Sequence, residues 1–131
     1  MNKLLMALAG LLACSAAAQD DYASLIAREW LEIVDAGYYM QSYQLSDDAF
    51  KAVLSAPQWE DALTKIRLPL GEVVWRSEIE QKKLESVPGW PNGEYITIDF
   101  NTKFEHTNAI VETITLSKSS GEWLPVGYFI R

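Results

Sequence analysis

Apolar residues recur at helical spacing along the first part of the chain, after residue 20. They share one face of a helix, at i, i+4, i+7 and i+8: Ile26, Trp30, Ile33 and Val34. Asp20 and Asp21 precede this helix as candidate N-caps, because aspartate accepts hydrogen bonds from the free backbone amides there. Gly37 predicts its end, since glycine adopts the left-handed conformation without a Cβ clash.

Three more helices are expected before residue 72. A short one covers residues 38–45, and a third, capped by Asp47 or Asp48, runs to residue 54. Pro57 suits the first turn of a fourth helix, because proline fixes a helical φ where no amide partner is needed. Its apolar face is expected to carry Trp59, Leu63 and Ile66. Pro69 and Gly71 then end the helical half of the chain.

From residue 72 the apolar period changes to two, which indicates strands. In residues 75–80, apolar Trp75 and Ile79 alternate with charged residues, so this strand should carry its charge on one face. Residues 96–104 alternate strictly, and residues 110–116 and 123–130 follow after short turns. The turn residues of 88–93 separate the first two strands. The pattern predicts a meander of four antiparallel strands with one apolar face.

Helices followed by strands, rather than alternating with them, are typical of an α+β fold. The sequence therefore predicts N-terminal helices packed on a curved four-stranded antiparallel sheet. Its core should combine residues from both halves: Trp30, Trp59, Phe100 and Leu116.

The first residues are typical of an export signal. Lys3 precedes an apolar run over residues 4–13, which is too short to span a bilayer and matches the central region of a signal peptide. Cleavage after Ala18 would make residues 1–18 the signal and 19–131 a single domain. Cleavage before Cys14 would instead make residues 1–13 a lipoprotein signal, with Cys14 as the lipidation candidate. Both schemes predict an exported chain, periplasmic or secreted, or anchored to a membrane by lipid.

Composition and charge exclude several classes of function. The 131 residues hold 11 Lys and Arg against 18 Asp and Glu, a formal charge of −7, which argues against binding nucleic acid. A single cysteine excludes an internal disulfide framework. With His106 as the only histidine, and no glycine-rich phosphate loop, we expect neither a metal site nor a cofactor. No residue is assigned a catalytic role.

Glu112 is the charged residue whose position is hardest to explain. It shares its strand face with Ile110, Ile114 and Leu116, which places a carboxylate on the apolar side of the sheet. A buried, unpaired carboxylate is costly, so it needs a cation or a raised pKa. Three interpretations remain open: an ion pair with Arg67 or Arg76, a solvent-filled concavity where Glu112 binds a ligand or acts as a base, and exposure at a bulge.

Other candidates have simpler interpretations. Trp90, in a loop rich in proline and glycine, would either contact a partner or fold back over the end of the sheet. Asp99 alternates with apolar neighbours and should face water, and His106 should be exposed in a hairpin turn. Glu29, Glu32 and Asp35 are expected to form a solvated helix face.

Many residues of the chain, in order, resemble landmarks of an exported bacterial family. In the helical half they are Trp30-Leu31, Asp35-x-Gly37-x-Tyr39, Ser42-Tyr43, Phe50, Trp59, Arg67-x-Pro69-Leu70-Gly71 and Arg76. In the strand half they are Pro88-Gly89-x-Pro91-x-Gly93-x-Tyr95, Phe100, Thr102, Phe104, Glu112-Thr113, Trp123 and Gly127-Tyr128. The chain resembles the domain-of-unknown-function family 4019, in which tryptophan is usual at the position of Tyr43. The resemblance implies a cystatin-like or nuclear-transport-factor-two-like cone and no activity.

The sequence therefore favours a small exported domain that binds or supports a partner without catalysis. The alternatives are an enzyme or carrier of the cone fold acting on a small apolar molecule, and a protein inhibitor suggested only by the cystatin-like shape. A catalytic cone would need an inward titratable group beside an open apolar cavity. The expected partner is a protein or a small molecule, a weak homodimer is compatible with the pattern, and membrane contact would come only through a lipid on Cys14.

Overall fold

A computed structural model describes residues 21–131, so both cleavage schemes and Cys14 lie outside the described residues. The chain is helical from residue 21 to residue 35, a segment we call the N-terminal helix. The other helices are α2 (Tyr39–Gln44), α3 (Asp48–Val53), α4 (Ala56–Arg67) and the 3₁₀ helix η1 (Leu68–Leu70). The strands are β1 (Val73–Leu84), β2 (Tyr95–Phe104), β3 (Ala109–Ser117) and β4 (Leu124–Ile130). Within the described range, no helix is both long and apolar enough to cross a bilayer.

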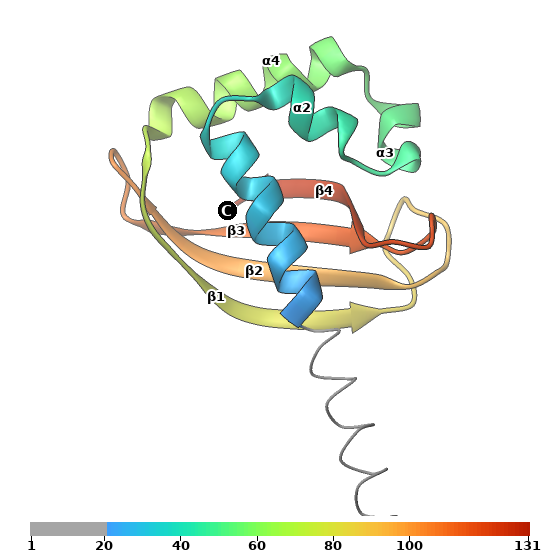
Figure 1. Cartoon of the computed structure of the whole chain (residues 1–131). Helices are drawn as coiled ribbons and strands as arrows, with labels where there is room; N and C mark the ends of the chain where they lie inside the picture. Colours follow the sequence, from blue (N-terminus) through green and yellow to red (C-terminus); the bar gives the residue numbers. More distant parts are fainter. Residues whose placement is uncertain (1–20) are drawn as a thin grey trace, which may run out of the picture.

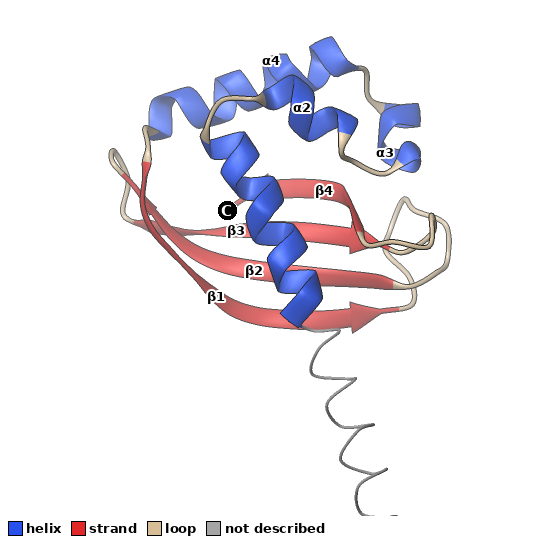
Figure 2. Cartoon of the chain, viewed as in Figure 1, coloured by secondary structure: helices blue, strands red, loops and turns tan. Residues whose placement is uncertain are grey.

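The strands form one antiparallel sheet in the order β1-β2-β3-β4, as the meander predicts. The sheet is curved, and the helices lie on one side of it (Figures 1 and 2). The N-terminal helix crosses the strands, while α2 packs against α4 and α3 reaches β4. The predicted α+β architecture is confirmed.

Local sequence signals set the helix ends. Gly37, at φ +84°, closes the N-terminal helix: its amide donates to the carbonyl of Val34, and the amide of Tyr38 donates to that of Ile33. Asp47 caps α3 through the amide of Ala49. Ser55 and Gln58 form a capping box at α4, where Pro57 occupies the first turn.

The core joins the helices to the inner face of the sheet. Trp30, Trp59, Phe100 and Leu116 all belong to one buried cluster, which confirms the predicted core. Ser42, fully buried on α2, connects two of these rings: its carbonyl accepts from the indole of Trp30, and its hydroxyl accepts from that of Trp59, each at 2.9 Å. These bonds satisfy the two polar groups that the buried indoles bring into the core.

The predicted face of each strand is confirmed for β2 and wrong for β1. The alternating residues of β2 from Ile96 to Phe104 are buried, as expected. In β1, however, Trp75 and Ile79 are 42% and 56% exposed, whereas Arg76 lies opposite the buried Thr102. The alternation is interrupted by two register shifts, one between Val73 and Trp75 and one between Glu78 and Glu80. Trp75 and Ile79 therefore lie on the outer side of the sheet and not on the face that packs against the helices.

The predicted helix faces also differ from the structure. The N-terminal helix buries Ala23, Ala27, Trp30, Leu31 and Val34, while Ile26 and Ile33 remain half-buried at the side. On α4, Ile66 is exposed, and Arg67 takes the buried position one residue later. Small alanines allow the N-terminal helix to approach the sheet closely, so its buried face is rotated from the predicted one.

Candidate functional site

The inner face of the sheet carries one fully buried carboxylate among mainly apolar side chains. Glu112, opposite Phe100 on the neighbouring strand, is 0% exposed. Its Oε1 accepts from Arg76 Nε at 2.8 Å, and its Oε2 accepts from Arg76 Nη2 at 3.2 Å. The predicted ion pair between Glu112 and one of two arginines is thus confirmed, with Arg76 as the partner.

Two neutral donors complete the surroundings of Glu112. The hydroxyl of Thr102, on β2, donates to Oε1, and the phenol of Tyr128, on β4, donates to Oε2. With the two bonds from Arg76, each carboxylate oxygen accepts two hydrogen bonds. A carboxylate bonded in this way has little remaining capacity to accept a proton from a substrate or to hold another ligand.

A second carboxylate extends the network to the helices. Asp35, in the last turn of the N-terminal helix, accepts from Arg76 Nη1 at 2.7 Å and from Arg76 Nη2 at 3.0 Å. It also accepts from Arg67 Nη2 at 2.8 Å. The expectation that Asp35 belongs to a solvated helix face is therefore wrong, although Glu29 and Glu32 are exposed as predicted. Asp35 turns inward because the two arginines provide the charge it needs.

We call the six residues of this network the polar cluster: Asp35, Arg67, Arg76, Thr102, Glu112 and Tyr128. Its two arginines balance its two carboxylates, so the formal charges cancel in the interior. The cluster connects the N-terminal helix, the end of α4 and all four strands. Such a connected network fixes how the helices sit on the sheet.

Burial and hydrogen bonding both act on the protonation of the cluster. Burial disfavours the charged form of Arg76, but the hydrogen bonds and charges of Asp35 and Glu112 outweigh it and raise the pKa of this guanidinium. Burial, followed by the charge of Glu112, raises the pKa of the Tyr128 phenol far above its usual range. Arg76 therefore stays cationic and Tyr128 stays a neutral donor at physiological pH.

Arg67 lies at the edge of the polar cluster and contacts it through Asp35. Its side chain is only 5% exposed, and its guanidinium lies 4.8 Å from the ring centroid of Phe104, a cation–π contact. Nη2 donates to Asp35, while Nε and Nη1 have no hydrogen-bond partner among the described residues. The sequence offered Arg67 as a partner of Glu112, but its ion pair is with Asp35.

The remaining sequence candidates lie apart from the polar cluster. Trp90 is half-buried and packs against the core, in agreement with the folded-back alternative; its role as a partner contact stays a prediction. Asp99 lies on the outer face of the sheet, where Thr113 Oγ1 donates to it at 2.6 Å and Arg131 Nη2 at 3.1 Å. His106 is exposed in the β2–β3 turn, as predicted. Cys14 lies outside the described residues.

A groove runs along the N-terminal helix beside the start of β4. We call it the helix–β4 groove; its volume is about 230 Å³, and it is lined mainly by apolar residues. One wall carries Tyr22, Ile26, Glu29, Trp30 and Ile33, and the other carries Leu45, Glu122, Trp123, Leu124 and Pro125. Ile26 and Ile33, which the sequence placed on the apolar face of this helix, line the groove, and Ile26 also packs against the core.

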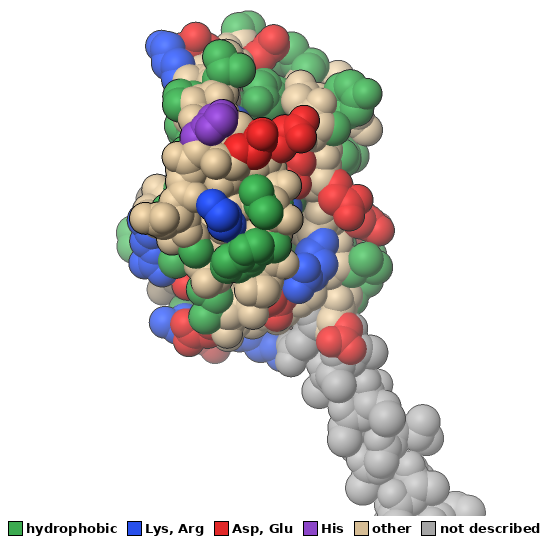
Figure 3. All heavy atoms as spheres, turned by 90° about the vertical axis from the view of Figure 1, so that its left-hand side faces the viewer, with side chains coloured by type: hydrophobic (Ala, Val, Ile, Leu, Met, Phe, Trp, Pro, Cys, Tyr) green, Lys and Arg blue, Asp and Glu red, His purple; other side chains and the backbone are tan. Residues whose placement is uncertain are grey.

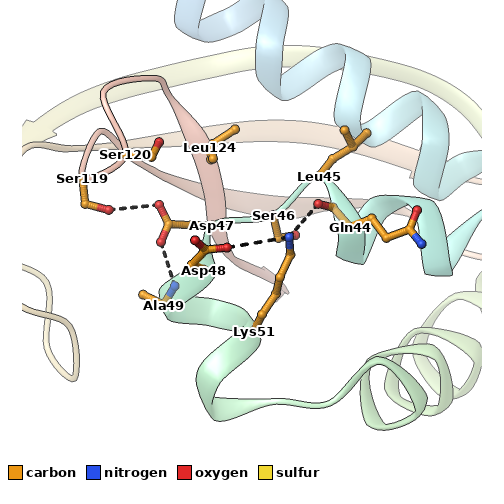
Figure 4. Close-up of a pocket in the computed structure, with 10 residues that line it drawn as sticks. All are labelled: Gln44, Leu45, Ser46, Asp47, Asp48, Ala49, Lys51, Ser119, Ser120 and Leu124. Atoms are coloured by element: carbon orange, nitrogen blue, oxygen red, sulfur yellow. Dashed lines mark hydrogen bonds and ion pairs between the residues drawn. The ribbon is translucent and has the colours of Figure 1, made fainter.

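A more polar hollow adjoins this groove at Leu45 and Leu124, which line both (Figure 4). Its polar groups bond to one another. Asp47 accepts from the Ala49 amide at 2.8 Å and from Ser119 Oγ at 3.0 Å, and its own amide donates to the carbonyl of Pro125 at 2.8 Å. These bonds attach the start of α3 to β4 and to the preceding turn, so the hollow has a structural explanation.

Sequence reasoning missed three members of the polar cluster. Thr102 shares the strict alternation of its strand with Phe100 and Phe104, which placed it inside without suggesting a partner. Asp35 follows Leu31 by four residues, and that spacing could have placed it on the buried face. Tyr128 is one of the family landmarks, but its contact with Glu112 depends on the pairing of β3 with β4 and was not predicted.

Comparison with known proteins identifies the family and adds no activity. Across residues 21–131, no group of three or more His, Cys, Asp or Glu side chains is arranged to hold a metal ion. None of the curated proteins compared with the chain matches it. The sequence model of one family matches residues 26–128, from the N-terminal helix to β4, and the chain thus belongs to the family described as Protein of unknown function (DUF4019).

Proposed function

We propose that this protein is an exported domain that binds a partner through its surface and carries out no catalysis. One observation carries the proposal. Glu112, the fully buried carboxylate on the inner face of the sheet, is bonded by Arg76, Thr102 and Tyr128. An enzyme or carrier of the cone fold needs a titratable group beside an open apolar cavity. Glu112 does not meet this requirement, because it is fully buried and its oxygens accept from protein donors.

The packing of the inner face supports the same proposal. Large side chains from the helices fill the space over β2 and β3, where Trp30 and Trp59 lie with ring centroids 6.1 Å apart. Trp30 also contacts Tyr128 edge-on at 5.7 Å. The side chains that would line a substrate cavity in a cone enzyme here contact one another, so the surface is the better candidate for binding.

The proposed location is outside the cytoplasm, either periplasmic or secreted, with a lipid anchor on Cys14 as the alternative to free release. The basic and apolar pattern of residues 1–13 supports export. The formal charge of −7 argues against nucleic acid as the partner. On the face drawn in Figure 3, Lys and Arg side chains are interspersed with Asp and Glu and do not gather in a basic patch.

Native mass spectrometry of the protein isolated from its own envelope fraction tests these statements together. We expect a chain that begins at Gln19, or at an acylated Cys14, and that retains a protein or peptide partner. An intact Met1 in a cytoplasmic fraction would contradict export. A stoichiometric small apolar molecule, released when Glu112 is changed to Gln in a chain that remains folded, would instead establish the carrier or enzyme.

A further inference from the structure

Resting on the proposed binding function, we infer that the helix–β4 groove is the docking site for a partner segment that carries apolar side chains flanked by Lys or Arg. The groove lies apart from the polar cluster and is formed by residues that the fold leaves incompletely covered. Its apolar lining, its size and the sign of its charges each constrain the occupant.

The apolar lining extends beyond what the core requires. Tyr22, Ile26, Glu29 and Ile33 fall at i, i+4, i+7 and i+11 and so share one face of the N-terminal helix. A different face of the same helix, with Ala23, Ala27 and Leu31, is buried in the core. Tyr22 and, across the groove, Leu45 remain 53% and 45% exposed. Exposed apolar side chains that face one another across a groove favour a binding surface over random exposure.

The dimensions favour side chains of a larger partner over a free small molecule. The volume of about 230 Å³ lies below the roughly 300–1,000 Å³ of most small-molecule pockets. From Tyr22 to Ile33 the wall rises about 16 Å, at 1.5 Å per residue. A helix of about three turns, or an extended segment of about five residues, matches that length.

The charges of the lining are all negative. Glu29 and Glu122 are its only charged residues among those described, and neither side chain has a hydrogen bond or ion pair to another described residue. In the adjoining hollow the exposed Asp48 lies 4.0 Å from Lys51, whose ammonium also donates to the Gln44 carbonyl at 2.7 Å, so the unpaired charge beside the groove is that of Glu29 and Glu122. An acidic rim around an apolar floor is complementary to apolar side chains flanked by cations.

The same charges disfavour a second copy of the chain as the occupant. Each copy has a formal charge of −7, so two copies joined through acidic rims would repel one another. Lys118 stacks over the Trp123 ring at 5.3 Å and lines a neighbouring hollow, so its ammonium is not part of the groove lining. A cationic segment gains from the rim, whereas a second copy does not.

Two labelled peptides of equal length test the inference with the full chain. One places Leu at helical spacing with Lys between, and the other carries Glu in place of every Lys. Fluorescence anisotropy at low salt should show binding of the Lys peptide only. Changing Leu45→Gln should weaken this binding about tenfold, because a partner side chain loses its apolar contact. Leu68→Gln, at an exposed apolar residue of η1, is the matched control and should leave it unchanged.

The double variant Glu29→Gln and Glu122→Gln tests the charge separately. It should weaken the Lys peptide about fivefold at low salt and reduce the dependence of binding on salt. Glu32→Gln, on the same helix but outside the lining, is its control. If Leu45→Gln fails to fold, Tyr22→Ser, in the first turn described, replaces it.

The outcomes separate this inference from the proposed function. Equal binding of both peptides, binding of neither, a dimer that Leu45→Gln dissociates, or a small molecule that it releases would each overturn the groove assignment. If a native partner remains bound to the Leu45→Gln variant, the binding function stands and the inferred site is wrong. If the protein from its envelope holds a small apolar molecule and no partner, the binding function itself is wrong.

Discussion

The substitution Glu112→Gln tests whether the polar cluster is structural. It keeps the size and shape of the side chain but removes its charge and turns one acceptor oxygen into an amide donor. Whichever oxygen is replaced, the new NH₂ faces a nitrogen of Arg76 together with a hydroxyl, Thr102 on one side or Tyr128 on the other. One donor–donor contact with the guanidinium is therefore unavoidable while the present geometry holds.

The expected loss follows from what Arg76 retains. Removing one partner of a buried ion pair costs about 3–5 kcal/mol when the other charge is left alone. Arg76 keeps two hydrogen bonds to Asp35, so its charge remains partly compensated. We therefore expect a loss near the lower limit, about 3 kcal/mol. For a domain of this size, that corresponds to a fall of about 10 °C in melting temperature.

Urea denaturation followed by tryptophan fluorescence measures this loss, since Trp30 and Trp59 report on the core. Glu60→Gln, at an exposed position of α4, is the control and should change the free energy of unfolding by less than about 0.5 kcal/mol. A loss below about 1 kcal/mol for Glu112→Gln would refute the reasoning. A stable variant that also lost a bound ligand would mean that Glu112 serves binding.

Three further measurements test other parts of the structure. Phe100→Ala should lower the free energy of unfolding by about 3–5 kcal/mol, because the ring is fully buried between helix and sheet; a loss below about 1 kcal/mol would contradict the orientation of β2. Gly71→Ala should lower the melting temperature, because Gly71 has φ +79° and an added Cβ would lie 2.9 Å from the Cβ of Glu105. Gly93→Ala is the control and should be nearly neutral, because the nearest atom to its added Cβ is 3.9 Å away. Tyr128→Phe should lose about 1.5–3 kcal/mol at pH 7, where the phenol donates to a carboxylate. Because the pKa of Tyr128 is raised on folding, its stabilisation is complete below the unfolded pKa near 10 and is lost as the pH rises above it. Urea denaturation from pH 8 to 11 should therefore show the gap between wild type and Tyr128→Phe narrowing above pH 10, and a constant gap would be inconsistent with the raised pKa.

Regular alternation and turn residues were enough to predict the sheet, but only where the strands are regular. The residues of β2 alternate without interruption, and their inner set is buried as predicted. β1 has the same alternation in sequence, yet register shifts on either side of residues 75–78 change which side chains face the core. A bulge depends on how two strands pair, and the sequence of one strand does not contain that information.

The candidate site could be predicted only in part for a related reason. The position of Glu112 among apolar neighbours required a cation, and this electrostatic argument named Arg76 as one of two candidate partners, of which the structure selects Arg76. The argument did not find Asp35, because hydropathy alone assigns an acidic helix residue to the solvent, and its spacing of four from the buried Leu31 was given no weight. It could not predict the burial of Arg67 either, since its place next to Phe104 depends on how α4 joins the sheet.

The polar cluster and the helix–β4 groove are connected through the ring of Trp30. This ring lines the groove, contacts Tyr128 edge-on at 5.7 Å and donates to the carbonyl of Ser42, so its position depends on the core beneath it. Tyr128 in turn bonds to Glu112. The contact with Trp30 needs only the ring of residue 128, whereas the bond to Glu112 needs its hydroxyl. Tyr128→Phe should therefore lower stability but leave binding of the Lys peptide unchanged, which separates the role of the polar cluster in folding from the role of the groove in recognition.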